Sequence, residues 1–263
     1  MERQKTSIVE ATKTTGIRIM PKISVITPVY NCSKYIAASI LSILRQSYTD
    51  YELIIVNDGS SDDTAKIVSS FSDKRIVFIN HKSNKGVAIR TNEAVDLARG
   101  EYIAIHDGDD ISLDFRLEME LRILEENKDL FCVGGHAIII DNGGNEVSKW
   151  THPPVDTIGC LKMFNKIKNP IINSSSMYRK SGFSQLGGYT KDRSLYTVPD
   201  LDFWGRALVS GFKFVNVQQP VICYRLNPMS VSRTKAKEMA IAHIVVLDRL
   251  RSKISKMIGD QNG

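Results

Sequence analysis

Short apolar segments alternate with longer amphipathic segments through the first 110 residues. β-branched runs at 22–27, 51–56, 75–80 and 102–107 have the composition of strands. The stretches between them, at 33–46, 62–71 and 86–100, place apolar residues at helical spacing. This alternation predicts βαβ units and a mostly parallel sheet that is covered by helices on both faces.

The second half of the chain follows a different pattern. Helices are predicted at 113–127, 181–187 and 200–211, and strands at 131–141 and 172–179. The sequence "NGGN" at 142–145 predicts a hairpin turn into a strand at 146–150. Because strands and helices no longer alternate, we expect a mixed sheet packed onto the first half, without an independent second domain.

Polar sequences follow each strand of the first half. They are "TPVYN", "NDGSSDDT", "HKSNKG" and "DGDD". Ligands bind outside the carboxyl ends of the strands in open α/β sheets. These loops therefore predict one crevice that contains hydroxyls, amides, a basic residue and a cluster of carboxylates.

Composition narrows the possible partners and the compartment. The chain has 263 residues, a net charge of +6 and a pI of about 9.0. No aromatic residues interleave with the basic ones, so we expect no nucleic acid partner. Four scattered cysteines without a CxxC pair favour free thiols over a zinc site. With no apolar run long enough to span a bilayer and no signal-peptide core in residues 1–21, we expect an N-terminal extension and a cytoplasmic protein.

Several familiar nucleotide and metal motifs are absent. No GxGxxG follows the first strand, and no GxxxxGK[ST] or kinase motif set occurs. The acidic loop does not match an EF-hand, because Ser112 stands at the glycine position.

The sequence Asp107-Gly108-Asp109-Asp110 ends the fourth strand with three carboxylates. Taken alone, it is more often a solvated loop in which Asp110 or Ser112 caps the next helix. Carboxylates this close repel one another, so a Mg²⁺ or Mn²⁺ ion would relieve the cost. Asp109 is then the direct ligand, and Asp107 meets the metal or a ribose hydroxyl. Strand alternation points His106 to the opposite side, as a structural histidine.

Two further loops carry candidate nucleotide contacts. Asp58 could accept hydrogen bonds from a base or ribose, or could belong to an ordinary turn before a helix. Gly86 begins a predicted helix and Arg90 follows one turn later, so both could face a diphosphate. The alternative makes Arg90 a surface residue of an amphipathic helix.

The segments "ISVITPVYN", "ELIIVNDGSSDDT", "NKGVAIRTN" and "GEYIAIHDGDD", in this order, resemble the inverting family-two glycosyltransferases of the GT-A fold. The resemblance runs from about Lys22 to Ser232. It implies a Rossmann-like three-layer α/β fold with a mostly parallel central mixed sheet and a C-terminal helical segment. It also implies that residues 22–110 form a nucleotide-binding half and residues 111–232 an acceptor-side half.

The resemblance further implies roles for residues of these loops. The first loop and the second-strand aspartate would hold the nucleotide, and the DxD motif from Asp107 to Asp109 would bind ribose and a metal that bridges the diphosphate. The residues so implied for the nucleotide are Thr27, Pro28, Tyr30 and Asp58.

Inversion needs one general base for the acceptor hydroxyl. Family members commonly carry a Glu-Asp pair that opens a helix continuing to Trp and Arg, and the matching sequence here is "PDLDFWGRAL". Aligned on Trp204, the base falls on Asp200, with Asp202 as the second candidate. Pro199 replaces the preceding acid and suits a helix start. The alternative role for Asp200 is a helix N-cap.

"CYRLNPMSVS" resembles the closing segment of the family, in which a His often stands at the position of Asn227. If this segment closes the site, Arg225, Ser230 and Ser232 contribute more to closing it than Asn227 does. Trp204 is expected on the acceptor side of the same site. An ordinary loop is the alternative. The turn at 187–189 would direct the chain towards the acceptor.

Residues 233–263 predict an amphipathic basic helix. Its apolar positions are Ile244, Leu247, Leu250, Ile254 and Ile258. Such a helix commonly docks onto its own domain or onto a dimer partner. The alternative is peripheral contact with anionic lipid at the inner face of the membrane.

Together these features predict an inverting, metal-dependent glycosyltransferase that moves a sugar from a nucleotide-sugar, in particular a UDP-sugar, to a glycan or lipid-linked acceptor in polysaccharide or capsule synthesis. Two alternatives stay open. One is a non-catalytic nucleotide-sugar binder, marked by Pro199 and Asn227. The other is a nucleotidyltransferase, although the first loop lacks the glycine-rich basic sequence which that class usually needs.

Overall fold

The computed structural model describes residues 20–259, and the predicted N-terminal extension therefore lies almost wholly outside the described residues. The first half consists of the following elements in chain order: β1 Ile23–Val29, α1 Ile36–Leu44, β2 Tyr51–Asp58, α2 Thr64–Ser69, β3 Ile76–His81, α3 Val87–Leu97 and β4 Tyr102–Ile105. Each strand and helix predicted for this half is present, with shifts of a few residues at the ends.

The elements of the second half are β5 Ile111–Ser112, α4 Arg116–Glu126, β6 Leu130–Ile140, β7 Glu146–Trp150, α5 Thr157–Phe164, η1 Asn173–Ser175, β8 Met177–Arg179, α6 Lys180–Gln185, η2 Arg193–Leu195, α7 Pro199–Val209, β9 Lys213–Arg225, α8 Val231–Thr234 and α9 Ala236–Gly259. The predicted hairpin is confirmed, because β7 pairs antiparallel with β6.

One nine-stranded mixed sheet runs through both halves, in the order β3-β2-β1-β4-β8-β6-β9-β5 with β7 beside β6. The first four strands are parallel to one another. β8 then pairs antiparallel with β4, which joins the second half directly to the first. The second-half strands therefore continue the same sheet, whereas the sequence predicted a mixed sheet packed onto the first half.

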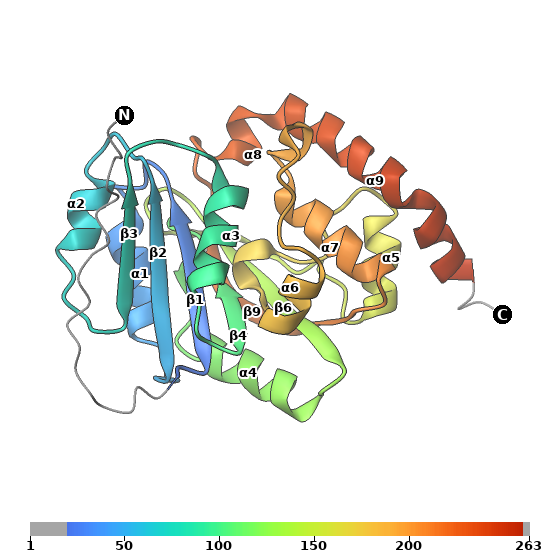
Figure 1. The fold of residues 1–263 in the computed structure, drawn as a ribbon, viewed down its shortest axis with the longest axis horizontal. Helices are drawn as coiled ribbons and strands as arrows, with labels where there is room; N and C mark the ends of the chain where they lie inside the picture. Colours follow the sequence, from blue (N-terminus) through green and yellow to red (C-terminus); the bar gives the residue numbers. More distant parts are fainter. Residues whose placement is uncertain (1–19, 260–263) are drawn as a thin grey trace, which may run out of the picture.

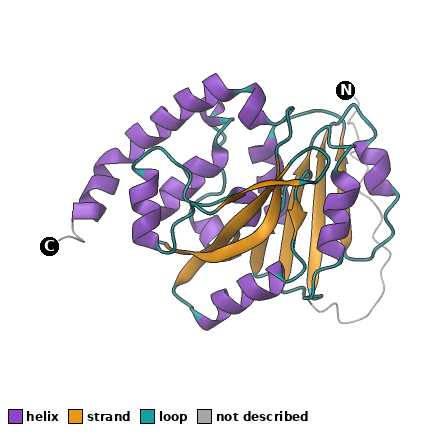
Figure 2. Ribbon diagram, turned by 180° about the vertical axis from the view of Figure 1, so that it is seen from behind, coloured by secondary structure: helices purple, strands orange, loops and turns teal. Residues whose placement is uncertain are grey.

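Helices cover both faces of the sheet in three layers (Figure 1). On one face α3 packs against β1 and β2, and α5, α6, α7 and α9 complete the core cluster that contains Ile26, Ile54 and Ile105. On the other face, seen from behind in Figure 2, α1, α2 and α4 cover the intervening residues, such as Val25 and Leu53. Both sides of each strand are apolar because both sides are covered.

Some elements of the second half differ from the sequence prediction. The predicted strand at 172–179 is shorter, because residues Asn173–Ser175 form a 3-10 turn before β8. β9 and α5 were not predicted. β9 interleaves polar residues and Pro220 among its apolar ones, and its pairing with β6 shifts register near Gly135 and His136. Such irregular pairing weakens the alternation on which a strand prediction depends.

The C-terminal helix docks onto its own domain. α9 packs against α7, and Leu247, Leu250 and Ile254 belong to the same core cluster as Trp204. Ile244 of the predicted apolar stripe is instead 52% exposed. Most of the stripe is therefore unavailable to lipid or to a dimer partner. Within residues 20–259, no helix has the combination of length and apolar character that a bilayer span requires.

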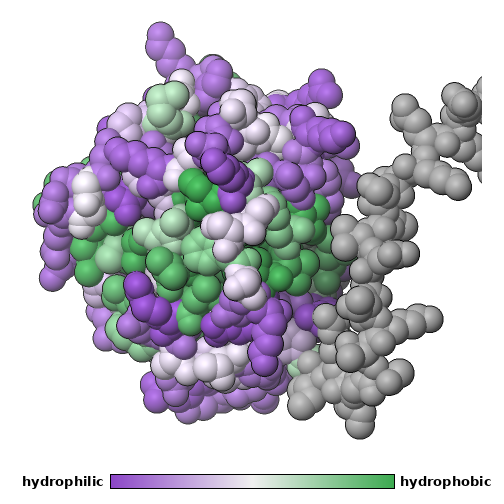
Figure 3. Space-filling model, turned by 90° about the vertical axis from the view of Figure 1, so that its left-hand side faces the viewer, coloured by the Kyte–Doolittle hydropathy of each residue, from purple (hydrophilic) through white to green (hydrophobic). Residues whose placement is uncertain are grey.

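β3 forms one edge of the sheet and pairs only with β2 among the described strands. Figure 3 views the molecule from this side and shows an apolar band between hydrophilic borders. Ile76 and Phe78 are half-buried on β3, and Val77 is exposed. Residues 74, 75, 81 and 82 place basic or histidine side chains at both ends of this edge, which discourages pairing with another strand.

Candidate active site at the carboxyl ends of the strands

The loops that follow β1 and β2 are bound to each other, as their shared position predicts. Asn31 donates its backbone N–H to Ser60 Oγ at 2.9 Å and accepts from the Ser61 N–H at 2.9 Å. The Cys32 N–H donates to Thr64 Oγ1 at 2.8 Å. These bonds fix the two loops relative to each other, because each loop satisfies backbone groups of the other.

Asp58, at the end of β2, organises the third loop. Its carboxylate accepts the N–H groups of Lys85 and Gly86, each at 2.8 Å, and the Arg90 Nε at 2.7 Å. Asp58 is 3% exposed and Arg90 is 2% exposed. Arg90 also donates to Glu93 and to the Ser83 carbonyl. The structure therefore differs from the expectation that Arg90 faces a diphosphate, because its guanidinium is committed to holding this loop.

Gly86 lies where the prediction placed it, immediately before α3. Its φ of 94° falls in a region that favours glycine. The residues predicted in the first loop differ in exposure: Thr27 is buried, Pro28 is half-buried and Tyr30 is 49% exposed. The Thr27 hydroxyl has no hydrogen-bond partner among the described residues. Of these three side chains, Tyr30 is the one most accessible to a ligand.

The three aspartates of the acidic loop have different surroundings. Asp107 and Asp109 are half-buried, whereas Asp110 is 1% exposed. Asp110 accepts hydrogen bonds from Ser174 Oγ at 2.5 Å and the Arg225 N–H at 2.9 Å. It thus joins the loop to η1 and β9 and does not cap α4, whose N-cap is Phe115. A side chain at Gly108 would collide with Val29, so this glycine is needed for packing.

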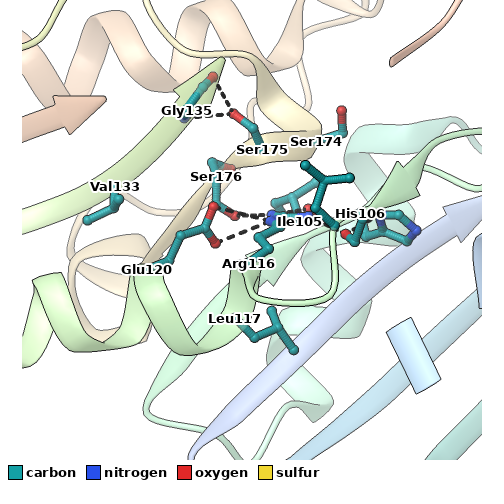
Figure 4. Close-up of polar contacts among 12 residues, drawn as sticks. Ile105, His106, Arg116, Leu117, Glu120, Val133, Gly135, Ser174, Ser175 and Ser176 are labelled. Carbon is teal, nitrogen blue, oxygen red and sulfur yellow. Dashed lines mark hydrogen bonds and ion pairs between the residues drawn. The ribbon is translucent and has the colours of Figure 1, made fainter. Parts of the chain in front are cut away.

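A buried polar network surrounds Arg116, next to the end of β4 from which the acidic loop continues (Figure 4). Arg116 and Glu120 are both 0% exposed, and Arg116 Nε lies 3.2 Å from Glu120 Oε1. Arg116 also donates to the carbonyls of Ile105 and Ser176 and to Ser112 Oγ. His106 lies 2.8 Å from Ser39 Oγ, and burial lowers its pKa to about 3. His106 is therefore a neutral, structural side chain, as predicted.

The surroundings of Asp107 disfavour negative charge on its carboxylate. Burial, followed by the charges of Asp109 and Asp200, raises the pKa of Asp107 to about 7. Asp200, in the first turn of α7, is therefore one of the charges that act on the acidic loop, although about 90 residues separate it from Asp107 in the sequence. A cation between these groups would reverse the pKa shift.

The carboxylates of the acidic loop fit a divalent cation whose remaining coordination positions are filled by a bound ligand. The Asp107 carboxylate accepts no hydrogen bond within the described part of the chain, and Asp109 Oδ2 accepts only Asn227 Nδ2, at 2.9 Å. Residues 20–259 contain no group of three or more acidic, His or Cys side chains that would hold a metal alone. Mg²⁺ and Mn²⁺ commonly bind through one or two carboxylates plus phosphate oxygens.

Asp200 lies at the start of α7, where Pro199 is the first helical residue, as predicted. Val198 is the N-cap, so Asp200 does not have the alternative role of a cap. Its carboxylate accepts Asn169 Nδ2 at 2.6 Å. Burial raises the pKa of Asp200, and hydrogen bonds from the Leu201 N–H and from Asn169 oppose that rise.

Asp202, the second candidate base, has a structural partner. It forms an ion pair with Arg206 Nε at 2.8 Å and is 6% exposed. Arg206 donates in turn to the carbonyls of Leu186 and Gly188, so this pair holds the turn at 187–189. Trp204 is 0% exposed within an aromatic cluster with Tyr178 and Phe203. The indole ring of Trp204 therefore lies in the core, and not beside the acceptor as expected.

The closing segment reaches the acidic loop. Arg225 donates from Nε to the Asp109 carbonyl at 2.8 Å and from one terminal nitrogen to the Asp141 carbonyl at 2.9 Å. Ser230 and Ser232 lie farther along, with their hydroxyls 3.0 Å apart. Asn227, at the position where the family often has His, contacts Asp109 directly. The segment thus lies over the predicted metal ligands.

Sequence reasoning missed two residues near Asp200. Asn169 comes from the loop after α5, and His243 comes from α9. Burial lowers the pKa of His243, and the charge of Asp200 opposes that shift. Neither residue lies in a recognisable motif, so no local signal pointed to them.

Comparison with known proteins agrees with this geometry. The sequence profile described as Glycosyl transferase family 2 matches residues 24–187. A putative glycosyltransferase, EpsE from Bacillus subtilis, is 35% identical over 76% of this chain and 71% of its own length. WfgD from Escherichia coli, a UDP-Glc:alpha-D-GlcNAc-diphosphoundecaprenol beta-1,3-glucosyltransferase, is 31% identical over 89% of both chains.

Solved structures show the same fold at lower identity. TarS from S. aureus in complex with UDP-GlcNAc has a TM-score of 0.70 at 18% identity, over 86% of this chain and 65% of that one. The mannosyltransferase PcManGT from Pyrobaculum calidifontis, in complex with GDP-Man and Mn²⁺, has a TM-score of 0.66 at 17% identity, over 88% of this chain and 65% of that one. This chain therefore spans a little under two thirds of each of those structures. On its profile match, its relatives and its GT-A fold, the protein is a member of glycosyltransferase family 2.

Proposed function

We propose that this protein is an inverting glycosyltransferase that transfers a sugar from a UDP-sugar to a hydroxyl of a glycan or lipid-linked acceptor, with Asp200 as general base. One observation carries the proposal. Asp200 is far from the acidic loop in sequence, yet it lies in the first turn of α7 with its carboxylate held by Asn169, and its charge contributes to the raised pKa of Asp107. In this proposal the base acts beside the carboxylates that would receive the donor diphosphate.

The residues of the crevice divide the work between donor and acceptor. The loops after β1, β2 and β3 receive the nucleotide, with Tyr30 exposed and Asp58 fixing the Lys85–Gly86 backbone. Asp109 and Asp107 would hold Mn²⁺ or Mg²⁺, which when bound stabilises negative charge on the diphosphate leaving group. Asn227 fixes one oxygen of Asp109, and Arg225 fixes the backbone of that residue.

Asp200 then acts on the acceptor. Its ionised carboxylate takes the proton of the acceptor hydroxyl as that oxygen attacks the anomeric carbon. Attack from the side opposite the leaving group inverts the anomeric configuration. The lipid-linked acceptor is proposed because WfgD and similar relatives act on diphosphoundecaprenol-linked sugars.

We also propose peripheral contact with anionic lipid, through the outer face of α9. Ile241 and Ile244 are 65% and 52% exposed on this helix. Lys237 lies one turn before Ile241, on the same side of the helix. Exposed apolar residues beside basic ones suit an anionic membrane surface, where such an acceptor would reside.

Donor binding and turnover test the proposal separately. We expect UDP-glucose or UDP-GlcNAc with Mn²⁺ to raise the melting temperature more than GDP-mannose does, because a ligand that binds the native state stabilises it. Asp200→Asn should retain this stabilisation and lose at least about 100-fold in turnover. Asp202→Asn is the matched control at the second candidate position. Unchanged turnover in Asp200→Asn would refute the base assignment, and wild-type binding without any turnover would favour the non-catalytic binder.

A further inference from the structure

The side-chain amide of Asn169 holds Asp200 from outside the helix that carries it. Asn169 Nδ2 donates to Asp200 Oδ2 at 2.6 Å, and Asn169 Oδ1 accepts the Ile171 N–H at 3.4 Å. The adjacent Pro170 carbonyl accepts Asn216 Nδ2 at 3.2 Å. The amide therefore projects from a loop that is tied to β9.

Asp200 has few other means of orientation. Its helix begins with Pro199, which has no N–H, and Val198 provides no side-chain cap. The Leu201 N–H is its backbone donor. Within residues 20–259, Asn169 is the only side chain with a hydrogen bond to this carboxylate. The direction in which the carboxylate points is thus set by a residue about 30 positions earlier.

Titratable groups surround Asp200, and a hydrogen-bond donor that does not titrate would therefore keep its effect on this carboxylate at every pH. Asp107 follows β4 and Tyr189 lies in the turn after α6, and the charge of Asp200 affects the pKa of both. His243 faces it from α9, but burial keeps the pKa of this imidazole low. An amide stabilises the ionised carboxylate at every working pH, because it does not titrate.

We propose that Asn169 is the positioning residue of the general base, which it orients and keeps ionised through the hydrogen bond to Asp200. The inference rests on the proposed function, in which Asp200 is the base. Asn169 touches no reacting atom in this scheme and acts only through Asp200.

Asn169→Asp tests this with little change in shape. The new carboxylate keeps an acceptor for the Ile171 N–H but loses the donor, and places a second negative charge beside Asp200. We expect the rising limb of kcat against pH to move up by at least one pH unit, measured as UDP release from UDP-glucose with Mn²⁺. KM for UDP-glucose should change less than about twofold, because the donor loops are untouched. Asn165→Asp, an exposed residue of the same segment, is the matched control and should leave the profile unchanged.

A titration without turnover gives a second reading. ¹³C NMR of aspartate carboxyl groups, with the Asp200 signal assigned through Asp200→Asn, should show the Asp200 midpoint at higher pH in Asn169→Asp. If that variant does not fold, Asn169→Ala replaces it, since loss of the donor leaves burial unopposed and should also raise the midpoint.

The outcomes separate the two ideas. An unchanged pH limb and an unchanged Asp200 midpoint in a folded Asn169 variant would overturn the role of Asn169. Wild-type turnover in Asp200→Asn would instead overturn the base itself. The Asp200 midpoint could shift in the Asn169 variant while Asp200→Asn keeps normal turnover. That result would confirm the contact but show that it has no role in catalysis, and it would also contradict the proposal.

Discussion

Arg116 and Glu120 show how a single buried pair can shape a site that it does not enter. Arg116 binds the last carbonyl of β4 and a carbonyl beside η1, immediately below the acidic loop. The loop is thereby held from the sheet side, while Ser174 and Arg225 hold Asp110 from the other. At the residue scale, the position of Asp107 and Asp109 depends on neighbours that no donor would touch.

Removing one partner of this pair should be costly. We expect Glu120→Ala to lower the free energy of unfolding by about 3–5 kcal/mol, because the Arg116 guanidinium would be left buried without its counter-charge. Urea unfolding measures the loss. Asp129→Ala is the control, since Asp129 pairs with Lys213 at the exposed surface and should contribute nothing measurable. Equal effects of the two substitutions would contradict this account.

The ionisation of Asp200 should be visible in the pH dependence of the wild-type enzyme. The base works as the carboxylate, and burial raises its pKa above the ordinary aspartate value. Turnover should therefore rise with pH through that elevated pKa and then level off. A profile of kcat for UDP release, with Asp202→Asn in parallel, checks this. A rising limb at the ordinary aspartate pKa of about 4 would contradict it.

At the scale of elements, α7 carries both chemistry and packing. Its first turn presents Asp200 to the crevice, while Trp204 and Gly205 face the core beside α5 and α9. A strong tertiary anchor at the middle of a helix fixes the direction of its first turn. The same aromatic cluster that removes Trp204 from the acceptor site therefore helps to place the base.

Gly205 tests this anchoring. A Cβ there would lie 2.3 Å from Phe164 and 2.7 Å from Leu250. Although alanine has the higher helix propensity, we expect Gly205→Ala to lower the free energy of unfolding by about 1–3 kcal/mol through overpacking. Gly259→Ala in α9 meets nothing within 4 Å and is the matched control. A Gly205→Ala protein as stable as wild type in urea would show that the three helices can separate without cost.

At the scale of the whole molecule, the C-terminal helix closes the core and leaves an outer face exposed. Leu247, Leu250 and Ile254 are buried, whereas Ile241 and Ile244 are not. Three positions of the stripe predicted from sequence, Leu247, Leu250 and Ile254, pack into the core, whereas Ile244 of the same stripe is exposed. The surface that remains for lipid is shorter and lies nearer to the closing segment.

Co-sedimentation with vesicles tests that surface. We expect the double substitution Ile241→Ser and Ile244→Ser to reduce binding to vesicles that contain anionic lipid, at unchanged melting temperature, since both side chains are exposed. Leu97→Ser, which removes an exposed apolar residue from α3, should bind like wild type. Equal binding by all three proteins would exclude this face of α9 as a membrane contact.

The sequence by itself determined the parallel half and the contents of its loops. Period and β-branched composition are local properties, so they predicted β1 to β4, α1 to α3 and the polar loops at their carboxyl ends. The ordered motifs of those loops also indicated the family. The structural role of His106 was predicted from strand alternation alone.

Only the tertiary structure decided how distant groups pair. It committed Arg90 to Asp58, placed Trp204 in the core, gave Asp202 to Arg206 and brought Asn169 to Asp200. It also added β9, whose register shifts hide it from pattern reading. The reason is physical: whether a polar side chain faces a ligand or a neighbour depends on which partners the fold brings within hydrogen-bonding distance, and sequence spacing contains no such information.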